Sequence, residues 1–384
     1  MKRTVLNPIF GACVSLAGLI STASAQSGRP SPKLDPPAAP AQITARENDQ
    51  GFSESVPSRR PRRSFTPPLS GGKNDGDRPR AAKAPTANGS VIKVETELVT
   101  VPVSVLDRQG LYVTGLERSD FTIFEDGIEQ KIAYFGASEK PFTVILLLDT
   151  SLSTNYKIEQ IREAAAAFVG QLRSQDTVGV IEFDGNIHVL AEPTSDRQRI
   201  YRAIAKADFG YGTSLYDSVY YTLRKKLGKV SGRKAVVLFT DGVDTTSDDA
   251  GYDTTLAFAE ESDTVIFPIY YNTFDWKKSQ SGSNSILMDT LGTTPEEYAL
   301  GRKYLLELAE YTGGRIFRAG PAADSLSAAF RGISEELRRQ YNLGYIPDKT
   351  GTLGQRKEIR VRVNRPDLVI RARDSYIVGS GRKP

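Results

Sequence analysis

The sequence contains almost no cysteine or histidine, the side chains that bind zinc and that complete most catalytic triads. Its 384 residues include one cysteine, Cys13, and one histidine, His188. This excludes a disulfide framework, a zinc site built from thiolates and imidazoles, and a catalytic triad with supporting histidines. His188 lies within an alternating run, where a histidine is more often structural. Gly210-Tyr211-Gly212 lacks the third glycine of a dinucleotide loop, and the chain has no Walker lysine motif.

Long apolar runs are also missing, except near the amino terminus. Lys2-Arg3 precedes a short apolar core from Ile9 to Ile20, and Ala23-Ser24-Ala25 has the small residues of a cleavage site. Because the core is short and interrupted by Gly and Ser, a cleaved segment is favoured over a membrane anchor. Residues 1–25 are therefore predicted to be a secretory signal peptide, and the exported chain is expected in the periplasm or outside the cell.

Positive charge is concentrated before residue 91. Residues 26–90 carry 11 basic and 6 acidic side chains, whereas residues 91–384 carry 37 and 40. A nucleic-acid partner is therefore not expected, because such domains usually have a basic face of their own. Residues 26–90 also hold 11 of the 21 prolines, so we predict a disordered Pro/Arg-rich linker. Its cluster from Arg59 to Arg63 is typical of a solubilising tether, although it can also attract anionic polymers or lipids.

Short strands are predicted on both sides of a central α/β region. In residues 91–140, valines from Val99 to Val105 alternate with polar residues as in a strand with one solvent-exposed face, and Pro102 indicates a sheet edge. A hairpin is predicted at Asp126-Gly127. Residues 341–378 contain three further strand patterns: Tyr341 to Ile346, Arg356 to Asn364 and Leu368 to Ala372. We expect these strands to pair with the first group and form one β domain, split in sequence, before a tail at residues 379–384.

Four arginines alternate along the last two of these strands: Arg360, Arg362, Arg371 and Arg373. Such a row can form a basic ligand-binding ridge. A solvated sheet face, which also discourages edge aggregation, is the favoured interpretation.

Residues 141–340 alternate strands with helices, as a doubly wound sheet does. The predicted strands are Phe142 to Leu148, Thr177 to Phe183, Asn186 to Leu190, Ala235 to Phe239, Thr264 to Tyr270 and Arg315 to Arg318, with an antiparallel edge hairpin at Asp184-Gly185. The predicted helices are Tyr156 to Arg173, Arg197 to Ala207, Ser214 to Lys226, Thr254 to Glu261, Arg302 to Tyr311 and Ala323 to Arg339. Phe274 to Thr293 is predicted to be a surface loop.

Acidic and hydroxyl side chains are concentrated where the central strands of this region end. Phe142 to Leu148 is apolar without alternation, as in a strand buried on both faces. Open α/β sheets place ligand crevices at the carboxyl ends of their strands. Five positions there form the candidate site: Asp149, Ser151, Ser153, Thr213 and Asp241. Taken singly, the hydroxyls can be helix caps and the aspartates turn formers, but their order and spacing together favour a metal site.

The same residues carry a resemblance to a known family. D-x-S-x-S from Asp149 to Ser153, a threonine before a mid-domain helix and the T-D-G turn at Thr240 to Gly242 resemble the metal-ion-dependent adhesion site of von Willebrand factor type A domains. Leu152 replaces the usual glycine, which affects the loop backbone and removes no ligand. Phe124 to Gly127 and Arg360 to Val363 are similar to bacterial secreted "VWFA-related" proteins, a likeness that extends over about residues 91–378.

The resemblance implies a doubly wound, Rossmann-like type A domain in the α/β region. Together with the strand patterns on either side, this predicts an α/β fold in which the type A domain is inserted into a small split β-sandwich-like domain. It also implies that Mg²⁺ or Mn²⁺ is bound directly by Ser151 and Ser153, through water by Asp149 and Asp241, and in a state-dependent way by Thr213. Neutral hydroxyls leave most of the metal charge unneutralised, so an open coordination position attracts a carboxylate from outside.

We therefore expect an exported, non-catalytic module that binds a protein partner through the partner's exposed Asp or Glu. An association with the cell envelope or cell surface, including cell adhesion, fits the predicted export. Two alternatives stay open at this point. One is a metal-free structural component of a cell-envelope assembly, and the other is a metal-dependent phosphohydrolase. The second is disfavoured because Ser151 stands where the D-x-D motif of such enzymes has its acid.

Overall fold

A computed structural model describes residues 51–56, 98–136, 140–151, 158–271, 294–320, 323–349 and 351–378. The predicted signal peptide, most of the predicted linker, the predicted loop from Phe274 to Thr293, the tail at residues 379–384 and the candidate ligand Ser153 lie outside these ranges. Within them, no helix is long and apolar enough to cross a membrane.

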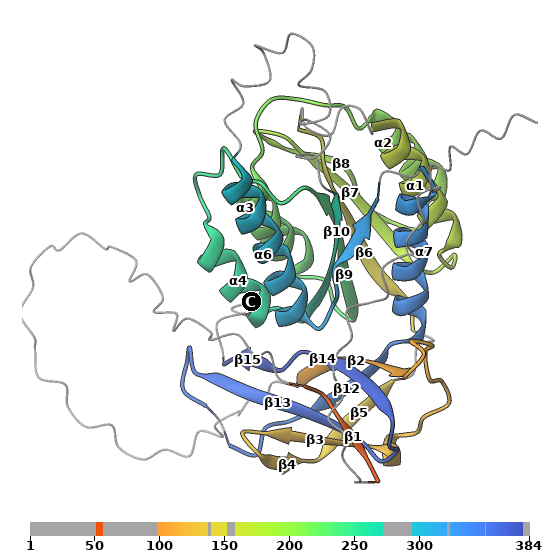
Figure 1. The fold of residues 1–384 in the computed structure, drawn as a ribbon, viewed down its shortest axis with the longest axis vertical. Coiled ribbons are helices and arrows are strands. Elements are labelled where there is room, and N and C mark those ends of the chain that lie inside the picture. The colour runs from red at the N-terminus through yellow and green to blue at the C-terminus, as the bar shows by residue number, and fades with distance from the viewer. Residues whose placement is uncertain are drawn as a thin grey trace, which may run out of the picture. The chain divides into compact units, whose positions relative to one another are not determined.

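A six-stranded sheet is the framework of the α/β region (Figure 1). Its spatial order is β11 (Phe317–Ala319), β10 (Thr264–Tyr271), β9 (Arg233–Thr240), β6 (Phe142–Asp149), β7 (Thr177–Phe183) and β8 (Ile187–Thr194). Adjacent strands are parallel except at the edge, where β7 and β8 pair antiparallel. The predicted doubly wound α/β fold and its antiparallel edge hairpin are confirmed.

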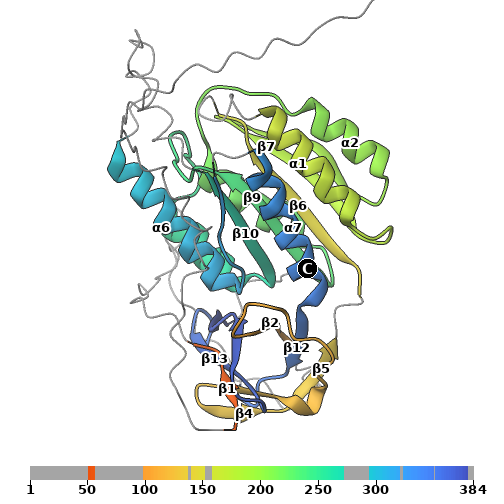
Figure 2. The ribbon, with the colours of Figure 1, turned by 45° about the vertical axis from the view of Figure 1, so that its right-hand side comes forward.

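Helices cover both faces of this sheet (Figure 2). One face carries α1 (Ile158–Gln171), α2 (Arg197–Lys206) and α7 (Ala323–Arg339). The other carries α3 (Leu215–Tyr221), the π-helical turn η3 (Thr222–Leu227), α4 (Tyr252–Glu261) and α6 (Pro295–Thr312). A strand between two helical layers needs an apolar side chain at every position, which explains the unbroken apolar run of β6.

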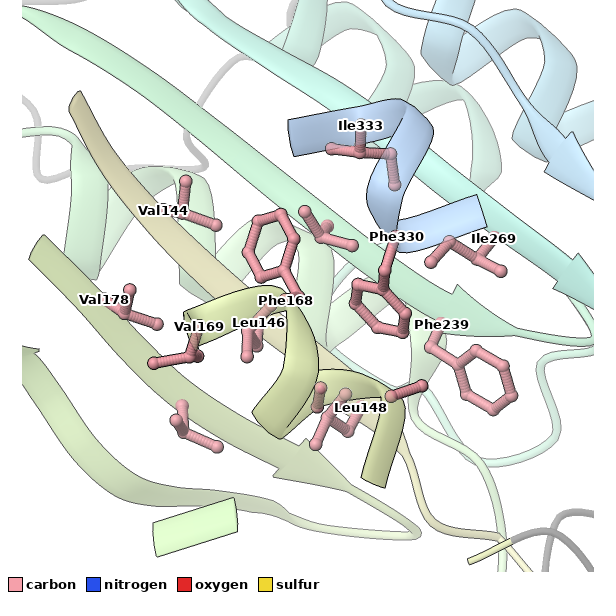
Figure 3. Close-up of a cluster of buried hydrophobic side chains, with 14 of the residues drawn as sticks. Val144, Leu146, Leu148, Phe168, Val169, Val178, Phe239, Ile269, Phe330 and Ile333 are labelled. Atoms are coloured by element: carbon pink, nitrogen blue, oxygen red, sulfur yellow. The ribbon is translucent and has the colours of Figure 1, made fainter. Parts of the chain in front are cut away.

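Alternate residues of β6 enter two separate cores. Leu146 packs in the first core with Phe168 of α1 and Phe330 of α7, whose ring centroids are 5.4 Å apart (Figure 3). Ile145 and Leu147 pack in the second core, against α3, α4 and α6. Both layers therefore hold β6 in place, and with it the residues that follow β6.

Helix α6 begins at Pro295, seven residues before the predicted start. The Thr294 hydroxyl accepts from the Glu297 backbone N–H (3.3 Å), and the Glu297 carboxylate accepts from the Thr294 N–H (2.7 Å). This capping box, with Pro295 at the first helical position, satisfies amides that a helix end leaves open. The sequence Thr294-Pro295-Glu296-Glu297 carries this signal, which the apolar periodicity alone missed.

The strands on either side of the α/β region pair with one another in two sheets. One sheet has the order β1 (Ser53–Glu54), β13 (Arg356–Val363), β3 (Phe121–Glu125) and β4 (Ile128–Gln130), with β15 (Ser375–Ile377) also on β13. The other has the order β14 (Leu368–Ala372), β2 (Val99–Asp107), β12 (Tyr341–Tyr345) and β5 (Ile132–Gly136). A short 3₁₀ turn, η1 (Arg118–Asp120), precedes β3. The predicted pairing of late with early strands is present, and one apolar core contains residues from both sheets.

Strand β2 differs from its prediction in two ways. It is not an edge strand, because it pairs with both β12 and β14. Pro102 is tolerated because the β14 pairing begins only at Val103, so no β14 residue pairs with it. The expected solvent-exposed face is also absent, since Pro102 and Ser104 are buried.

Part of the predicted linker is ordered as β1. Ser53 and Glu54 pair with β13, and the Ser55 N–H donates to the Val361 carbonyl (2.8 Å). The Ser55 hydroxyl accepts from the Val361 N–H (2.9 Å). The linker prediction is therefore wrong at residues 51–56, where three kinds of contact hold the chain: hydrogen bonds to β13, the ion pair of Glu54 with Arg362, and the packing of the Arg362 guanidinium on the Phe52 ring.

The alternating arginines do not share one solvated face. Arg373 is 5% exposed and donates to the backbone carbonyls of Glu260, Ser262 and Ser375 (3.0–3.1 Å). Among the four, only Arg360 has a side chain that is more than half exposed: it is 51% exposed, and it forms an ion pair with Glu54. The favoured interpretation as a solvated face is wrong for Arg373, because the chain folds this residue against α4.

Two fully buried glutamates of the α/β region contact the β region, which consists of the two sheets formed by the flanking strands. The Glu336 carboxylate of α7 accepts from the hydroxyls of Ser104 and Tyr112 (3.0 Å each). The Glu260 carboxylate of α4 accepts two hydrogen bonds from Arg356 (2.8 Å each). Glu260 lies shortly before β10 begins, so this contact is near the amino-terminal ends of the parallel strands. The carboxyl-terminal ends of these strands, where the candidate site lies, are at the opposite end of the sheet.

Candidate metal centre

The candidate site lies where the strand order of the sheet reverses. From β6 the chain continues to β7 on one side, and later returns to β9 on the other side of β6. Asp149 is the last residue of β6, and Asp241 follows the last residue of β9. In open α/β sheets the ligand crevice forms at such a reversal, outside the carboxyl ends of the two strands. The topology thus brings together two acidic residues that are 92 positions apart.

Asp149 is the most constrained residue of the site. Its side chain is fully buried, and its Oδ1 atom accepts hydrogen bonds from the Ser151 hydroxyl (2.6 Å) and the Ser151 backbone N–H (3.0 Å). Its Oδ2 atom accepts from the Thr240 hydroxyl (2.6 Å), which in turn accepts from the Gly242 N–H (3.0 Å). Asp149 and Ser151 therefore lie side by side, as the motif predicted, and the end of β9 is tied to the end of β6.

Burial and the negative charge of Asp241 raise the pKa of Asp149 from 3.8 to about 7. Burial is the larger cause, since it removes water from the charged form. Hydrogen bonds from Ser151 and Thr240 act in the opposite direction and do not offset it. Asp241 is 2% exposed, and its Oδ1 atom accepts from the Val243 N–H (3.1 Å). Two buried carboxylates therefore disfavour each other's charge, a situation that a bound cation relieves.

Thr213 belongs to a third loop, which backbone hydrogen bonds join to the other two. The Gly210 N–H donates to the Thr150 carbonyl (2.9 Å), and Gly210 forms a bridge with Ser151. The Thr213 N–H donates to the Thr245 hydroxyl, and the Thr213 carbonyl accepts from the Thr245 N–H (2.9 Å each). Thr213 is 7% exposed. All three loops that carry the described candidate residues are thus held at one edge of the sheet.

Gly210 fits its place because it has no side chain. A Cβ atom at this position would lie 1.6 Å from the Asp184 Oδ2 atom. Asp184 belongs to the turn between β7 and β8, and its carbonyl accepts from the Ser214 N–H (2.6 Å). The loop around Gly210 is therefore pressed against this turn, and a larger residue would move it away from Ser151.

Three polar residues outside the five candidates organise these loops. The Thr240 hydroxyl links Asp149 to Gly242, as described above. The Asp217 carboxylate accepts from the backbone N–H groups of Asp248, Asp249 and Ala250 (2.7–3.1 Å). Asp244 accepts from the Tyr216 N–H (3.1 Å) and from the Ser247 hydroxyl (2.5 Å). The T-D-G motif contains Thr240, so the sequence offered a signal for this residue. The roles of Asp217 and Asp244 depend on contacts between distant loops, which no local pattern indicates.

The donor set consists of oxygen atoms. Asp149, Ser151, Thr213 and Asp241 offer carboxylate and hydroxyl oxygens, and Ser153 lies outside the described residues. Across the described ranges, no three His, Cys, Asp or Glu side chains are grouped so that they could hold a metal. Oxygen-only donors with few carboxylates suit Mg²⁺ or Mn²⁺ and not a thiolate- or imidazole-bound metal.

Residues 144–243 match the model of the von Willebrand factor type A domain. This part of the chain is a von Willebrand factor type A domain. The match begins in β6 and ends just after the T-D-G turn, and it includes Asp149, Ser151, Thr213 and Asp241. The predicted resemblance to type A domains is confirmed at the level of the domain.

Relatives of the chain are distant. A UPF0353 protein of Nocardia farcinica is 23% identical over 222 residues, which are 51% of this chain and 63% of that protein. The chain thus spans less than two thirds of that relative. Among solved structures, the type A domain of the type V pilus tip protein Mfa5 from Porphyromonas gingivalis is 13% identical, with a TM-score of 0.39, over 51% of this chain and 94% of that one. A von Willebrand factor type A protein from Catenulispora acidiphila is 10% identical, with a TM-score of 0.40, over 75% and 76%.

Proposed function

We propose that this chain is an exported, non-catalytic binding module that engages a protein partner through a divalent cation. The cation is Mg²⁺ or Mn²⁺, held at the carboxyl ends of β6 and β9. The partner supplies an Asp or Glu carboxylate to the open coordination position. Export rests on the signal-peptide pattern of residues 1–25, and association with the cell envelope or cell surface follows from it.

The observation that carries the proposal is the buried pair of Asp149 and Asp241. Two carboxylates that are 0% and 2% exposed, with the charge of one raising the pKa of the other, form an unfavourable arrangement in a stable core. A divalent cation converts this repulsion into attraction, and it favours the charged form of both groups. The neighbouring hydroxyls of Ser151 and Thr213 add oxygen donors without adding charge.

The proposed roles of the donors follow the resemblance to adhesion-site domains. Ser151 and Ser153 bind the cation directly, Asp149 and Asp241 act through water, and Thr213 changes its role with the state of the domain. Because the hydroxyls are neutral, much of the charge of the cation remains for the partner's carboxylate. The bound cation supplies this attraction, and the protein orients the donors through Thr240 and the backbone of the three loops.

A metal-free structural role is the second candidate. One observation favours it: both carboxylate oxygens of Asp149 already accept hydrogen bonds from Ser151 and Thr240. In that case the T-D-G turn and the Asp149 turn would only join β6 to β9. The two candidates differ in their response to metal.

Thermal unfolding during a Mg²⁺ or Mn²⁺ titration separates the two candidates. A cation that binds only the folded protein raises the midpoint of unfolding in proportion to the logarithm of its concentration above the dissociation constant. We expect this rise in the wild type and its loss in Asp149→Ala and Ser151→Ala. Asp176→Asn is the matched control, since Asp176 is 1% exposed but accepts from the Phe142 N–H at the other end of β6. A wild-type midpoint that stays constant at millimolar metal would favour the structural role.

A further inference from the structure

The edge of β13 is occupied by a segment that is distant from it in the sequence. Residues 51–56 lie along this edge as β1 (Figure 1), with Glu54 opposite Arg362 in the antiparallel register. Within the described part of the chain, the hydrogen bonds and ion pairs of residues 51–56 all go to residues 360–368. The segment is therefore held like a short peptide that adds a strand to a sheet edge.

Two buried serines form the polar part of this contact. The Ser53 hydroxyl donates to the Arg365 carbonyl (2.8 Å) and accepts from the Leu368 N–H (2.9 Å). Ser55 exchanges two hydrogen bonds with Val361, one through its N–H and one through its hydroxyl. Ser53 and Ser55 are 9% and 6% exposed, so water has little access to these bonds. A segment without hydroxyls at these two positions would leave backbone N–H groups of the edge without partners.

The charges at this edge are complementary. Glu54 accepts a hydrogen bond from the Arg362 guanidinium (2.8 Å), and its second cationic neighbour, Arg360, is 3.9 Å away. The Arg362 guanidinium also lies 3.9 Å from the centroid of the Phe52 ring and 4.9 Å from that of the Phe124 ring in β3. The edge therefore selects an acidic residue with an aromatic residue two positions before it.

The length of the connection does not confine β1 to its own β13. Residues 57–97, which are 41 residues, separate Val56 from Leu98, where the next described range begins. A chain of that length spans up to about 140 Å when extended, so the segment can reach a neighbouring copy. Residues 51–56 contribute no side chain to the apolar core of the β region described above. Removal of the segment from the edge therefore breaks edge contacts and leaves that core intact.

We infer that two copies of this chain join by exchanging residues 51–56, so that the segment of each copy lies on β13 of the other. An exchanged segment makes the same contacts as one held within a single copy, because only the connection differs. The connection favours the segment of the same copy by an effective concentration of about a millimolar or less. Once one segment has crossed, the second crosses within the same complex, so the two contacts reinforce each other. This interface lies in the β region and is independent of the proposed metal site.

Charge reversal tests the exchange because it separates each segment from its own edge. Glu54→Arg places an arginine opposite Arg362, and Arg362→Glu places a glutamate opposite Glu54, so each variant alone repels its own segment. An equimolar mixture of the two variants restores opposite charges at both exchanged contacts. In analytical ultracentrifugation at about 0.1 mM, we expect each variant alone to be monomeric and the mixture to form a dimer. The mixture should associate at least about tenfold more tightly than the wild type does with itself, because no segment of the same copy competes.

Two controls and the wild type accompany the mixture. The double variant Glu54→Arg/Arg362→Glu restores opposite charges within one copy, and it should be monomeric at this concentration, like the wild type. Glu335→Arg mixed with Arg339→Glu reverses an ion pair within α7 (3.3 Å), whose side chains are 52% and 43% exposed, and should form no dimer. The wild type itself should form a growing fraction of dimer as its concentration approaches about 1 mM.

Three results would overturn the inference. One is a mixture of Glu54→Arg and Arg362→Glu that stays monomeric although circular dichroism shows both variants to be folded. Another is dimer formation to the same extent by either variant alone or by the control mixture, which would place the contact elsewhere. The third is a dimer that forms with Mg²⁺ and not in EDTA, since the contacts of β13 need no metal. If a variant does not fold, the wild type decides, and a wild type that is fully monomeric at about 1 mM overturns the exchange.

Discussion

The Asp149→Asn substitution should destabilise the folded protein at acidic pH and stabilise it at basic pH. In EDTA, the raised pKa of Asp149 means that the folded protein binds this proton more tightly than the unfolded chain does. The contribution of Asp149 to stability is therefore present below pH 3.8 and is lost as pH rises to about 7. The asparagine side chain carries no charge at any pH, so the Asp149→Asn variant does not lose stability in this way.

The size of the effect follows from the pKa values and the hydrogen bonds. A change from 3.8 to about 7, at roughly 1.36 kcal/mol per pKa unit, corresponds to about 4 kcal/mol above pH 7. Against this, an amide has only one acceptor oxygen, whereas Asp149 uses both of its oxygens. The lost acceptor costs about 1 to 3 kcal/mol. Asp149→Asn should thus be more stable than the wild type by about 1 to 3 kcal/mol at pH 8, and less stable by a similar amount near pH 4.

Urea denaturation followed by circular dichroism, in EDTA at several pH values, measures this difference directly. Asp241→Asn provides a second comparison, since removing its charge should lower the pKa of Asp149 and reduce the pH dependence without abolishing it. With Mg²⁺ present, the wild type should gain stability and Asp149→Asn should not. In EDTA, the unfolding free energies of the wild type and Asp149→Asn could instead differ by the same amount, with the same sign, at every pH from 4 to 8. That result would refute the assignment of a buried Asp149 that becomes charged in this range.

Two further substitutions test the contact between α4 and the β region, and the position of the loop beside the site. Glu260→Gln should destabilise the chain by about 3 kcal/mol in urea denaturation, because it leaves the Arg356 guanidinium without its carboxylate. The control is Glu159→Gln, which removes an ion pair at the surface, where the Glu159 side chain is 74% exposed. This control should change stability by about 0.5 kcal/mol or less. Gly210→Ala should destabilise by about 1 to 3 kcal/mol and weaken the Mg²⁺ response, because its Cβ atom would overlap Asp184; a wild-type response in this variant would show that the loop position does not matter.

The α/β region was largely predictable because its signals are local. The strand β7 occupies Thr177–Phe183 and the helix α7 Ala323–Arg339, as their periodicity predicted. Burial on both faces was evident in β6 because no polar residue interrupts it. The start of α6 was missed because its first turns are polar, and only the capping residues Thr294 to Glu297 mark the helix there.

The errors in the β region have a different origin. The pattern of β2 is that of a half-exposed strand, yet Ser104 is buried because its hydroxyl donates to Glu336 of α7, 232 positions later. Arg373 has the spacing of a solvated residue, yet α4 covers it. A polar residue can be buried wherever a distant partner satisfies its hydrogen bonds, and no local pattern contains that partner.

The sequence by itself determined which residues can form the site, since the D-x-S-x-S and T-D-G motifs and the strands before them are local features. Only the tertiary structure decided that Asp149 is fully buried, that Thr240 donates to it, and that Phe209 and Tyr211 stand exposed beside Ser151. The physical reason is that burial, charge coupling and exposure depend on which loops meet at the edge of the sheet. That meeting is set by the order of the strands in space and not by their order along the chain.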